Sequence, residues 1–148
     1  MRSEIGAEDA FAMIESARRR AESLGVRVSI AVVDRGGHLK AFLRMDGAEL
    51  AGPTLATDKA YTAVAHRTPT HELAELAAPG GPLFGLHTGA GGRYVIFGGG
   101  IPIVANGEVI GAVGVSGASV EEDVACAEEA VETAHGRLGL PVSGAEAR

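Results

Sequence analysis

Lys59 is the residue whose type and setting most suggest chemistry. The chain has eleven arginines and only two lysines, and Lys59 lies within TDKAYTAVAH, among alanine, valine and tyrosine. Because most cationic positions are arginine, a lysine here indicates that an amine is required. A partly buried lysine can lose its proton and act as a base or a nucleophile. The structural alternative is an ion pair with Asp58, Asp34 or another acid.

Carboxylates mark the ends of two predicted elements. Asp34 ends the apolar stretch VRVSIAVVD and precedes Arg35-Gly36-Gly37. Acids at strand ends commonly accept hydrogen bonds from turn amides, and the functional alternative is a carboxylate that faces a cleft near Lys59. Asp123 follows Glu122 in the first turn of the last predicted helix, where capping and the helix dipole account for both acids.

The five histidines show no metal-binding spacing. HExxH, CxxC, CxxCH and GxSxG are all absent, so the sequence predicts no metal site, covalent haem or serine nucleophile. His66 lies beside a predicted helix break and His87 lies in a glycine-rich loop, where either could be a ligand. The single cysteine, Cys126, falls among alanines and is expected to be a buried, small apolar residue.

Hydrophobic periodicity and turn residues predict the elements that position these groups. Asn106-Gly107 predicts a two-residue hairpin turn, and a loop rich in glycine and proline covers residues 79–92. The expected helices cover residues 7–24, 54–66, 71–77 (capped by Thr70) and 119–138, and the expected strands cover 26–34, 39–45, 93–97, 101–105 and 108–116. This order predicts an α+β fold with an antiparallel sheet of about five strands covered by helices.

Glycines in and before the last predicted strand indicate a close approach to the backbone. Gly111 and Gly114 lie where glycine normally weakens a strand, so a packed helix, a ligand or a neighbouring subunit is expected beside them. Gly98, Gly99 and Gly100 precede the hairpin and could offer free backbone amides to a ligand.

Composition restricts the partners. The chain has 148 residues, which predicts a single domain with an ordered core of about residues 5–140. Its net charge of −6 argues against nucleic acid or an anionic membrane as the partner. No apolar run approaches the roughly 20 residues of a membrane span, and the first residues have no apolar signal core, so a cytoplasmic protein is expected.

Three segments together resemble the GlcG/HbpS family, also called the haem-degrading domain family, which includes the C-terminal domain of PduO-type corrinoid adenosyltransferases. The segments are AVVDRGGHLKAFLRMDGA (31–48), KAYTAV (59–64) and GGGIPIVANGEVIGAVGVSGASVEED (98–123). The resemblance covers about residues 5–138. It implies a profilin-like α/β/α layering around a five-stranded antiparallel sheet, and assembly as a dimer, tetramer or octamer.

The resemblance also bears on ligands and site residues. Some members bind haem, and the PduO-type domain uses a histidine of its N-terminal helix as a haem ligand. Residues 7–24 contain no histidine, so that ligand has no counterpart here. The positions that match the family pattern are Asp34, Arg35, Arg44, Asp46, Lys59, Thr62, Ser116, Glu122 and Asp123.

Three functions remain open. The first is binding of haem or a related tetrapyrrole, with His66 or His87 as ligand and with Thr62, Ser116 and Asp123 near the site. The second is a cofactor-free enzyme acting on a carbonyl or carboxylate metabolite. In this enzyme, Lys59 is the base or Schiff-base residue, and Asp34 assists it. Either Arg35 or Arg44 binds the carboxylate of the substrate, and the amides of residues 98–100 stabilise an oxyanion. The third is a structural or accessory homo-oligomer assembled through the glycine-rich strand.

Overall fold

A computed structural model describes residues 4–141 of the chain. It has four strands, five α-helices and one 3₁₀ turn among these residues. In chain order they are α1 (Ala7–Leu24), β1 (Ser29–Asp34), β2 (Leu39–Arg44), α2 (Gly52–His66), α3 (Thr70–Leu76), the 3₁₀ turn η1 (Leu86–Thr88), α4 (Gly89–Gly92), β3 (Gly100–Ala105), β4 (Glu108–Ser116) and α5 (Val120–Leu138).

The strands form one antiparallel sheet in the order β2-β1-β4-β3. Two hairpins, β1–β2 and β3–β4, therefore lie side by side through β1 and β4. Asn106 and Gly107 have φ of 53° and 78°, which confirms the expected turn with two positive-φ residues between β3 and β4. The α+β class with an antiparallel sheet is also as expected.

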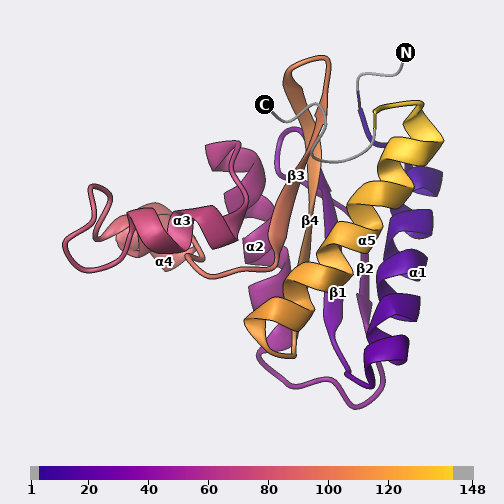
Figure 1. The fold of residues 1–148 in the computed structure, drawn as a ribbon, viewed down its shortest axis with the longest axis horizontal. Helices are drawn as coiled ribbons and strands as arrows, with labels where there is room; N and C mark the ends of the chain where they lie inside the picture. The colour runs from indigo at the N-terminus through magenta and orange to yellow at the C-terminus, as the bar shows by residue number, and fades with distance from the viewer. Residues whose placement is uncertain (1–3, 142–148) are drawn as a thin grey trace.

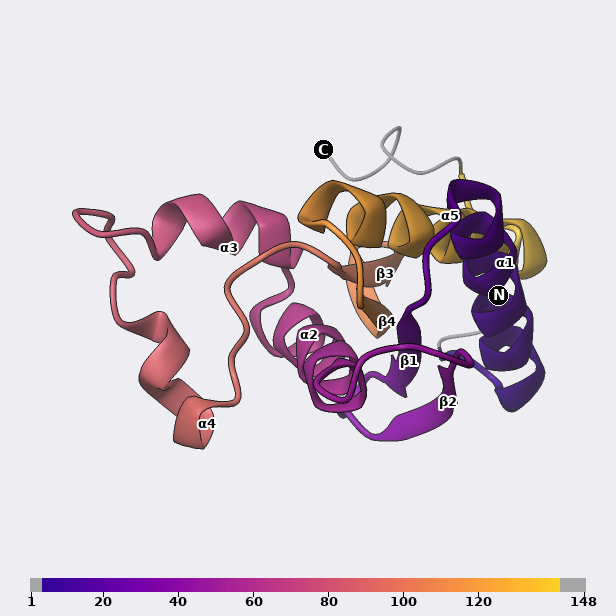
Figure 2. The same cartoon turned by 90° about the horizontal axis from the view of Figure 1, so that it is seen from below.

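Helices cover both faces of the sheet (Figure 1). α1 and α5 pack together on one face, over a core of isoleucine, valine, methionine and alanine side chains. α2 covers β1 and β4 on the other face, and Figure 2 shows the strands between α2 and the α1–α5 pair. The sheet is thus the middle layer of the part of the chain that carries the candidate residues.

α2 lies very close to the sheet because small residues line the contact. Ala56, Ala60 and Ala63 of α2 are fully buried against Ala112 of β4 and its neighbours. A Cβ atom at Gly114 would overlap the carbonyl oxygen of Ala56 and lie 2.6 Å from the amide nitrogen of Ala60. Of the causes expected for Gly114, the packed helix is the one the structure shows.

Gly111 faces the opposite side of the sheet. A Cβ there would lie 2.7 Å from the Cγ1 atom of Ile5 and 2.7 Å from the carbonyl oxygen of Val33. The chain entering α1 therefore fills the space that this glycine leaves. Intramolecular packing accounts for both glycines of β4.

The expected strand at residues 93–97 is wrong, and the sheet has four strands rather than five. This segment crosses the outer side of α2, where side chains of the helix hold it. Arg93 Nε donates to Asp58 Oδ1 at 2.8 Å, and the Val95 amide donates to Thr62 Oγ1 at 3.0 Å. These bonds hold the segment against a helix instead of pairing it with a strand.

Most predicted helix ends are confirmed. Gly25 and Gly139 have left-handed φ of 73° and 70° at the ends of α1 and α5, and Ser119 forms the expected capping box with Glu122. Thr70 differs from expectation, because it is the first residue of α3 and Pro69 occupies the cap. Its hydroxyl instead accepts a hydrogen bond from the Gly100 amide at 2.9 Å.

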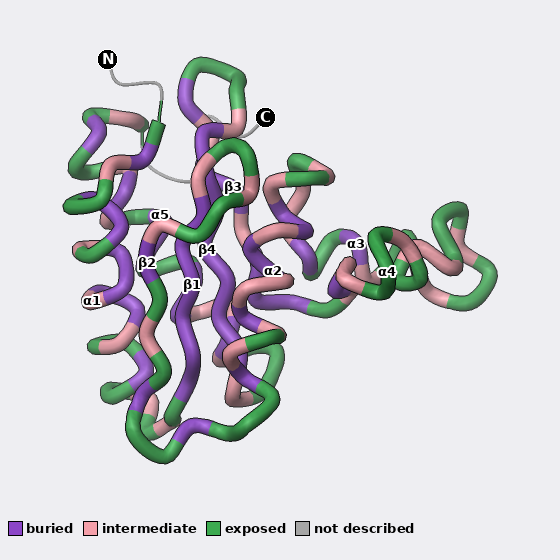
Figure 3. Tube along the Cα trace, turned by 180° about the vertical axis from the view of Figure 1, so that it is seen from behind, coloured by how far each residue is buried: buried purple, intermediate pink, exposed green. Residues whose placement is uncertain are grey.

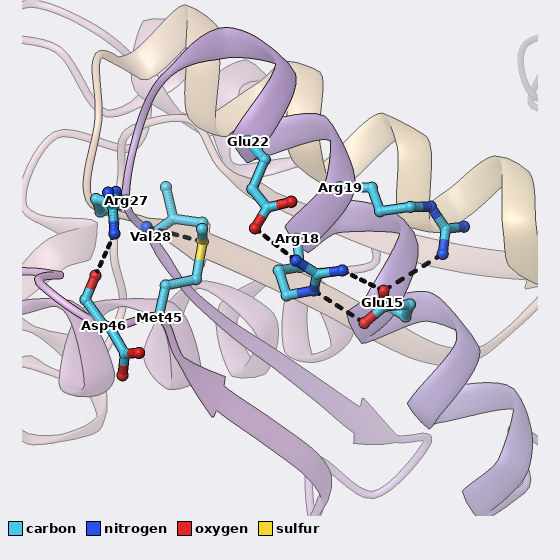
Figure 4. Close-up of polar contacts among 8 residues, drawn as sticks. All are labelled: Glu15, Arg18, Arg19, Glu22, Arg27, Val28, Met45 and Asp46. Carbon is cyan, nitrogen blue, oxygen red and sulfur yellow. Dashed lines mark hydrogen bonds and ion pairs between the residues drawn. The ribbon is translucent and has the colours of Figure 1, made fainter.

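The outer face of α1 is a network of exposed ion pairs (Figure 4). Arg18 bonds to Glu15 and lies 2.6 Å from Glu22, and Arg19 lies 3.4 Å from Glu15. Figure 4 also shows the Arg27 guanidinium donating to the Asp46 carbonyl oxygen at 2.9 Å, which joins the two chain segments at the open end of the β1–β2 hairpin.

Residues 71–92, called the arm below, project away from the sheet and its helices (Figures 1 and 2). Figure 3 shows that the arm is mostly exposed or partly exposed. Leu73 and Ala77 are buried, whereas Leu76, Leu83 and Phe84 are 40%, 41% and 62% exposed. The arm therefore presents apolar side chains to its surroundings.

Both sheet edges have features that interrupt regular pairing. β3 carries Pro102 at its centre and a register shift between Ile103 and Val104. β2, at the other edge, carries Lys40 and Arg44. Proline has no amide hydrogen and charged side chains repel a second strand, so both features protect an open edge.

We predict that Gly114→Ala destabilises the protein by about 1–3 kcal/mol, because the added methyl group must push α2 from the sheet. Gly136→Ala is the matched control: a Cβ atom added at Gly136, in α5, would meet no other element of the described chain within 4 Å, so alanine should stabilise by up to about 1 kcal/mol. Urea unfolding of the three proteins measures both changes. Equal midpoints for Gly114→Ala and the parent would contradict the close packing.

Candidate functional site

Lys59 is at the centre of a buried polar cluster at one end of the sheet. Its amine donates to the Val115 carbonyl oxygen at 2.9 Å and to Asp123 Oδ2 at 3.1 Å. The side chains of Lys59 and Asp123 are 0% and 4% exposed. Asp123 also accepts a hydrogen bond from the Ala118 amide at 3.0 Å. The pair therefore links α2, β4 and the first turn of α5.

Residues 97–100, called the strap, close over Lys59. The Phe97 ring centroid lies 5.0 Å from the amine. Gly99 has φ of 131°, and a Cβ there would lie 2.8 Å from Lys59 Nζ. Gly100 passes so close to the Lys59 carbonyl group that only hydrogen fits at its Cα. The strap glycines thus allow the chain to cover the lysine.

The strap amides are not all free for an oxyanion. The Gly100 amide donates to Thr70, and the Gly99 carbonyl oxygen accepts from the Val115 amide at 2.9 Å, extending the β4 ladder. The Gly98 Cα packs against Val120 and Val124 of α5. These contacts give the three glycines packing roles.

Burial and pairing act in opposite directions on the buried pair. Burial lowers the pKa of Lys59, and Asp123 raises it in return. Burial raises the pKa of Asp123, while Lys59 and the Ala118 amide lower it. Desolvation outweighs pairing for both groups, as expected where water is excluded. The arrangement is that of a structural ion pair, which was one of the alternatives for Lys59.

Asp34 lies in a different part of the molecule. It pairs with Gly111 in the sheet, whereas Lys59 contacts Val115 four residues further along β4. Asp34 Oδ1 accepts from the Gly36 and His38 amides, each at 2.9 Å. Burial raises the pKa of Asp34, but these amide bonds outweigh it and leave the pKa below its ordinary value. The structure does not bring Asp34 to Lys59.

The other expected ligand residues are also dispersed. Arg35 lies in the turn after β1, 3.6 Å from Glu108, and Arg44 lies at the far end of β2, where it donates to the Ala48 carbonyl oxygen at 3.4 Å. Ser116 is buried at the end of β4, opposite Ser29. The two arginines named as alternatives for gripping a carboxylate therefore lie at opposite ends of the β1–β2 hairpin, and neither lies beside Lys59.

A second cluster lies on the outer side of α2, and we call it the α2 aromatic surface. Its members are Asp58, Tyr61, Thr62 and His66 of α2 with Arg93 and Tyr94 from the crossing segment. The Arg93 guanidinium lies 3.7 Å from the Tyr61 ring centroid, and the Tyr61 and Tyr94 rings stack at 6.2 Å. The His66 ring meets the edge of Tyr94 at 4.4 Å. Tyr61, Arg93 and Tyr94 were not predicted as site residues. Arg93 and Tyr94 were missed because residues 93–97 were assigned to the sheet, and Tyr61 gains its role only through contact with them.

His66 is held in one tautomer on this surface. Its Nδ1 atom lies 3.1 Å from the Thr62 carbonyl oxygen, which can only accept, so Nδ1 carries the proton. In the neutral ring, Nε2 then carries the lone pair. A histidine whose other ring nitrogen donates to a carbonyl group is the usual arrangement of a metal ligand.

His87 belongs to the arm, in the η1 turn, and its ring lies 6.3 Å from that of Phe84. It is exposed. His66 and His87 thus lie on separate segments, one on a rigid helix and the other on the projecting arm.

Cys126 is fully buried, as expected, and burial raises the pKa of its thiol to about 11. Across residues 4–141, no group of three or more histidine, cysteine or acidic side chains is placed to hold a metal ion. In the same range, none of the helices has the length and apolar character needed to cross a membrane.

We predict that Lys59→Met costs about 3–5 kcal/mol of stability, because Asp123 remains buried without its cation. The double variant Lys59→Met with Asp123→Leu should recover about half of that loss or more. Lys40→Met is the control, since it replaces the other lysine of the chain on an edge strand. Chemical unfolding gives all three values, and a single variant as stable as the parent would show that the pair is dispensable.

Comparison with known proteins places this geometry in a family. Residues 5–132 match the family described as haem degrading protein HbpS-like. An uncharacterised 15.0 kDa protein of Citrobacter freundii is 43% identical over 120 residues, which are 81% of this chain and 84% of that protein. The corrinoid adenosyltransferase PduO of Salmonella typhimurium is 41% identical over 83% of this chain, but the match spans only 37% of PduO.

A solved structure has the same fold. The crystal structure of a PduOC–haem complex superimposes with a TM-score of 0.85 and 38% identity, over 88% of this chain and 94% of that one. The family match extends from α1 through most of α5 and includes the Lys59–Asp123 pair, the strap and the α2 aromatic surface. The chain belongs to the HbpS-like family.

Proposed function

We propose that the protein binds haem or a related tetrapyrrole, with His66 as the iron ligand. The observation that carries this proposal is the His66 ring, whose Nδ1 is engaged by the Thr62 carbonyl oxygen and whose Nε2 is left with a lone pair. The haem complex of a solved relative and the description of the family support the choice of ligand.

The surroundings of His66 suit a flat aromatic ligand. Tyr94 and Tyr61 provide ring faces and edges beside it, and Arg93 adds a guanidinium plane stacked on Tyr61. Aromatic rings and guanidinium groups both stack on π-systems. Haem iron would supply one-electron and O₂ chemistry there, and the protein would supply the ligand and the surface.

His87 is the second candidate ligand. It lies beside Phe84, and Leu83 is also exposed in the arm, so this segment offers an apolar contact with a histidine. His66 has the advantage of a helix that fixes its ring, because a site on a rigid element holds its ligand more accurately than a loop.

The cofactor-free enzyme needs a substrate to reach Lys59. Asp123, Val115 and Phe97 surround its amine, and the side chain has no exposed area. Lys59 and Asp34 also lie apart along β4. We therefore assign Lys59 to the architecture and do not propose catalysis by it.

We expect hemin titration to give a saturable one-to-one complex with a sharpened Soret band, and His66→Ala to weaken it about tenfold or more through loss of the ligand. His135→Ala is the matched control, because His135 Nδ1 also contacts a carbonyl oxygen, that of Pro141 at 2.6 Å, but on α5. His87→Ala tests the arm. Unsaturable absorbance, or a His66→Ala protein that binds like the parent, would refute the proposed site.

We also propose that copies of the chain form a homo-oligomer through the arm. The supporting observation is the exposure of Leu76, Leu83 and Phe84 on a projecting segment with few buried residues of its own. Association would bury these side chains, and each Å² of apolar surface removed from water would stabilise the oligomer by about 25 cal/mol.

Phe84→Asp should therefore reduce the mass measured by light scattering, because it places a charge in the proposed contact. Leu50→Asp is the control, since Leu50 is 95% exposed and lies before α2, outside the arm. A parent protein that is monomeric at the same concentration would rule out this assembly.

A further inference from the structure

A cavity of about 390 Å³ lies outside both clusters described above. Three segments meet there: the turn after β1, the C-terminal end of α2 and the β3–β4 hairpin. Its lining consists of Arg35, Val64, Arg67, Gly107, Glu108 and Val109. Two arginines and one glutamate thus line it, in a protein whose net charge is −6.

The ion pair between Arg35 and Glu108 is exposed to solvent. Arg35 Nη1 lies 3.6 Å from Glu108 Oε1, and these side chains are 46% and 71% exposed. Exposed pairs of this kind contribute little, so the pair with Glu108 does not by itself keep a ligand carboxylate from Arg35. Arginine is the side chain best suited to a planar carboxylate, because its donors form a fork of matching geometry.

Arg67 is a non-glycine residue in a backbone conformation that favours glycine. Arg67 ends α2 with φ of 54° and ψ of 39°, in the left-handed region. The same position after α1 and after α5 is glycine, with φ of 73° and 70°. Glycine adopts this conformation without the steric cost that other residues incur. An arginine at this position therefore costs stability that a glycine would not.

Asp34 positions the other arginine. Arg35 and Gly36 are the central residues of a turn closed by the Gly37 amide, which donates to the Asp34 carbonyl oxygen at 2.9 Å. The Asp34 carboxylate holds the same turn through the Gly36 and His38 amides. These bonds fix the backbone from which Arg35 reaches the cavity.

We infer that this cavity binds the carboxylate of a small aliphatic acid. Arg35 and Arg67 take the carboxylate oxygens, Val64 and Val109 contact the aliphatic chain, and Glu108 disfavours the anion. The carboxylate belongs either to a free metabolite or to a propionate group of the tetrapyrrole, and the second case rests on the function proposed above.

Glutarate, a five-carbon dicarboxylate, is the probe, and the Gly107 and Val109 amide signals in NMR spectra report on the cavity. Arg35→Gln and Arg67→Gly should each weaken binding about threefold or more, and Glu108→Gln should strengthen it about two- to fivefold. Arg67→Gly should also melt no lower than the parent, which separates loss of binding from loss of fold. Arg19→Gln, on the exposed face of α1, is the control.

Hemin and hemin dimethyl ester distinguish the two sources. If both arginine variants bind hemin more weakly and the ester equally well, the carboxylate is a propionate. If they bind hemin normally and lose glutarate, it is a free acid. If neither glutarate nor hemin responds to the arginine variants, the inference is overturned, while a Soret band that depends on His66 would leave the proposed function intact.

Discussion

The placement of every candidate group depends on how closely α2 approaches the sheet. Ala56, Ala60 and Ala63 face the strands, and Gly114 leaves room for the helix backbone itself. With 3.6 residues per turn, fixing these alanines also fixes the directions of the remaining side chains. Lys59 points toward the end of β4 and is buried with Asp123, whereas Tyr61 and His66 point outward. A helix held further from the strands would leave Lys59 without its partners.

Local signals predicted much of this fold. Glycines at residues 25 and 139, the Ser119–Glu122 capping box and the Asn106-Gly107 turn each act over a few residues, and each was found as expected. Residues 93–97 show where such reasoning fails. Their run of aromatic and β-branched residues suits a strand, but Asp58 and Thr62, more than thirty residues earlier, hold them against a helix. Only the tertiary structure brings those partners together.

The candidate site was harder to predict for the same reason. Lys59 was singled out correctly as an unusual residue, but its partner Asp123 is 64 positions away and was interpreted through its own helix end. Asp34 accepts hydrogen bonds from the amides of its own turn, which the sequence predicts. Its separation from Lys59 follows from strand register, because Asp34 pairs with Gly111 whereas Lys59 contacts Val115. His66 was named as a ligand, whereas the Tyr94 ring that packs against it comes from a segment expected in the sheet. Residue types thus identified the candidate side chains, and the topology of the fold determined which of them come into contact.

The two edges of the sheet limit how copies of this chain can combine. Pro102 removes a donor from the centre of β3. If two β2 strands met in antiparallel fashion about Phe42, Lys40 of each copy would lie opposite Arg44 of the other, and the like charges would repel. A sheet continuous across molecules is therefore disfavoured at both ends. The association proposed through the arm would use side chains instead of strand edges, which favours finite, closed assemblies over fibres. The same edge chemistry would keep a partly folded chain from templating aggregation during synthesis.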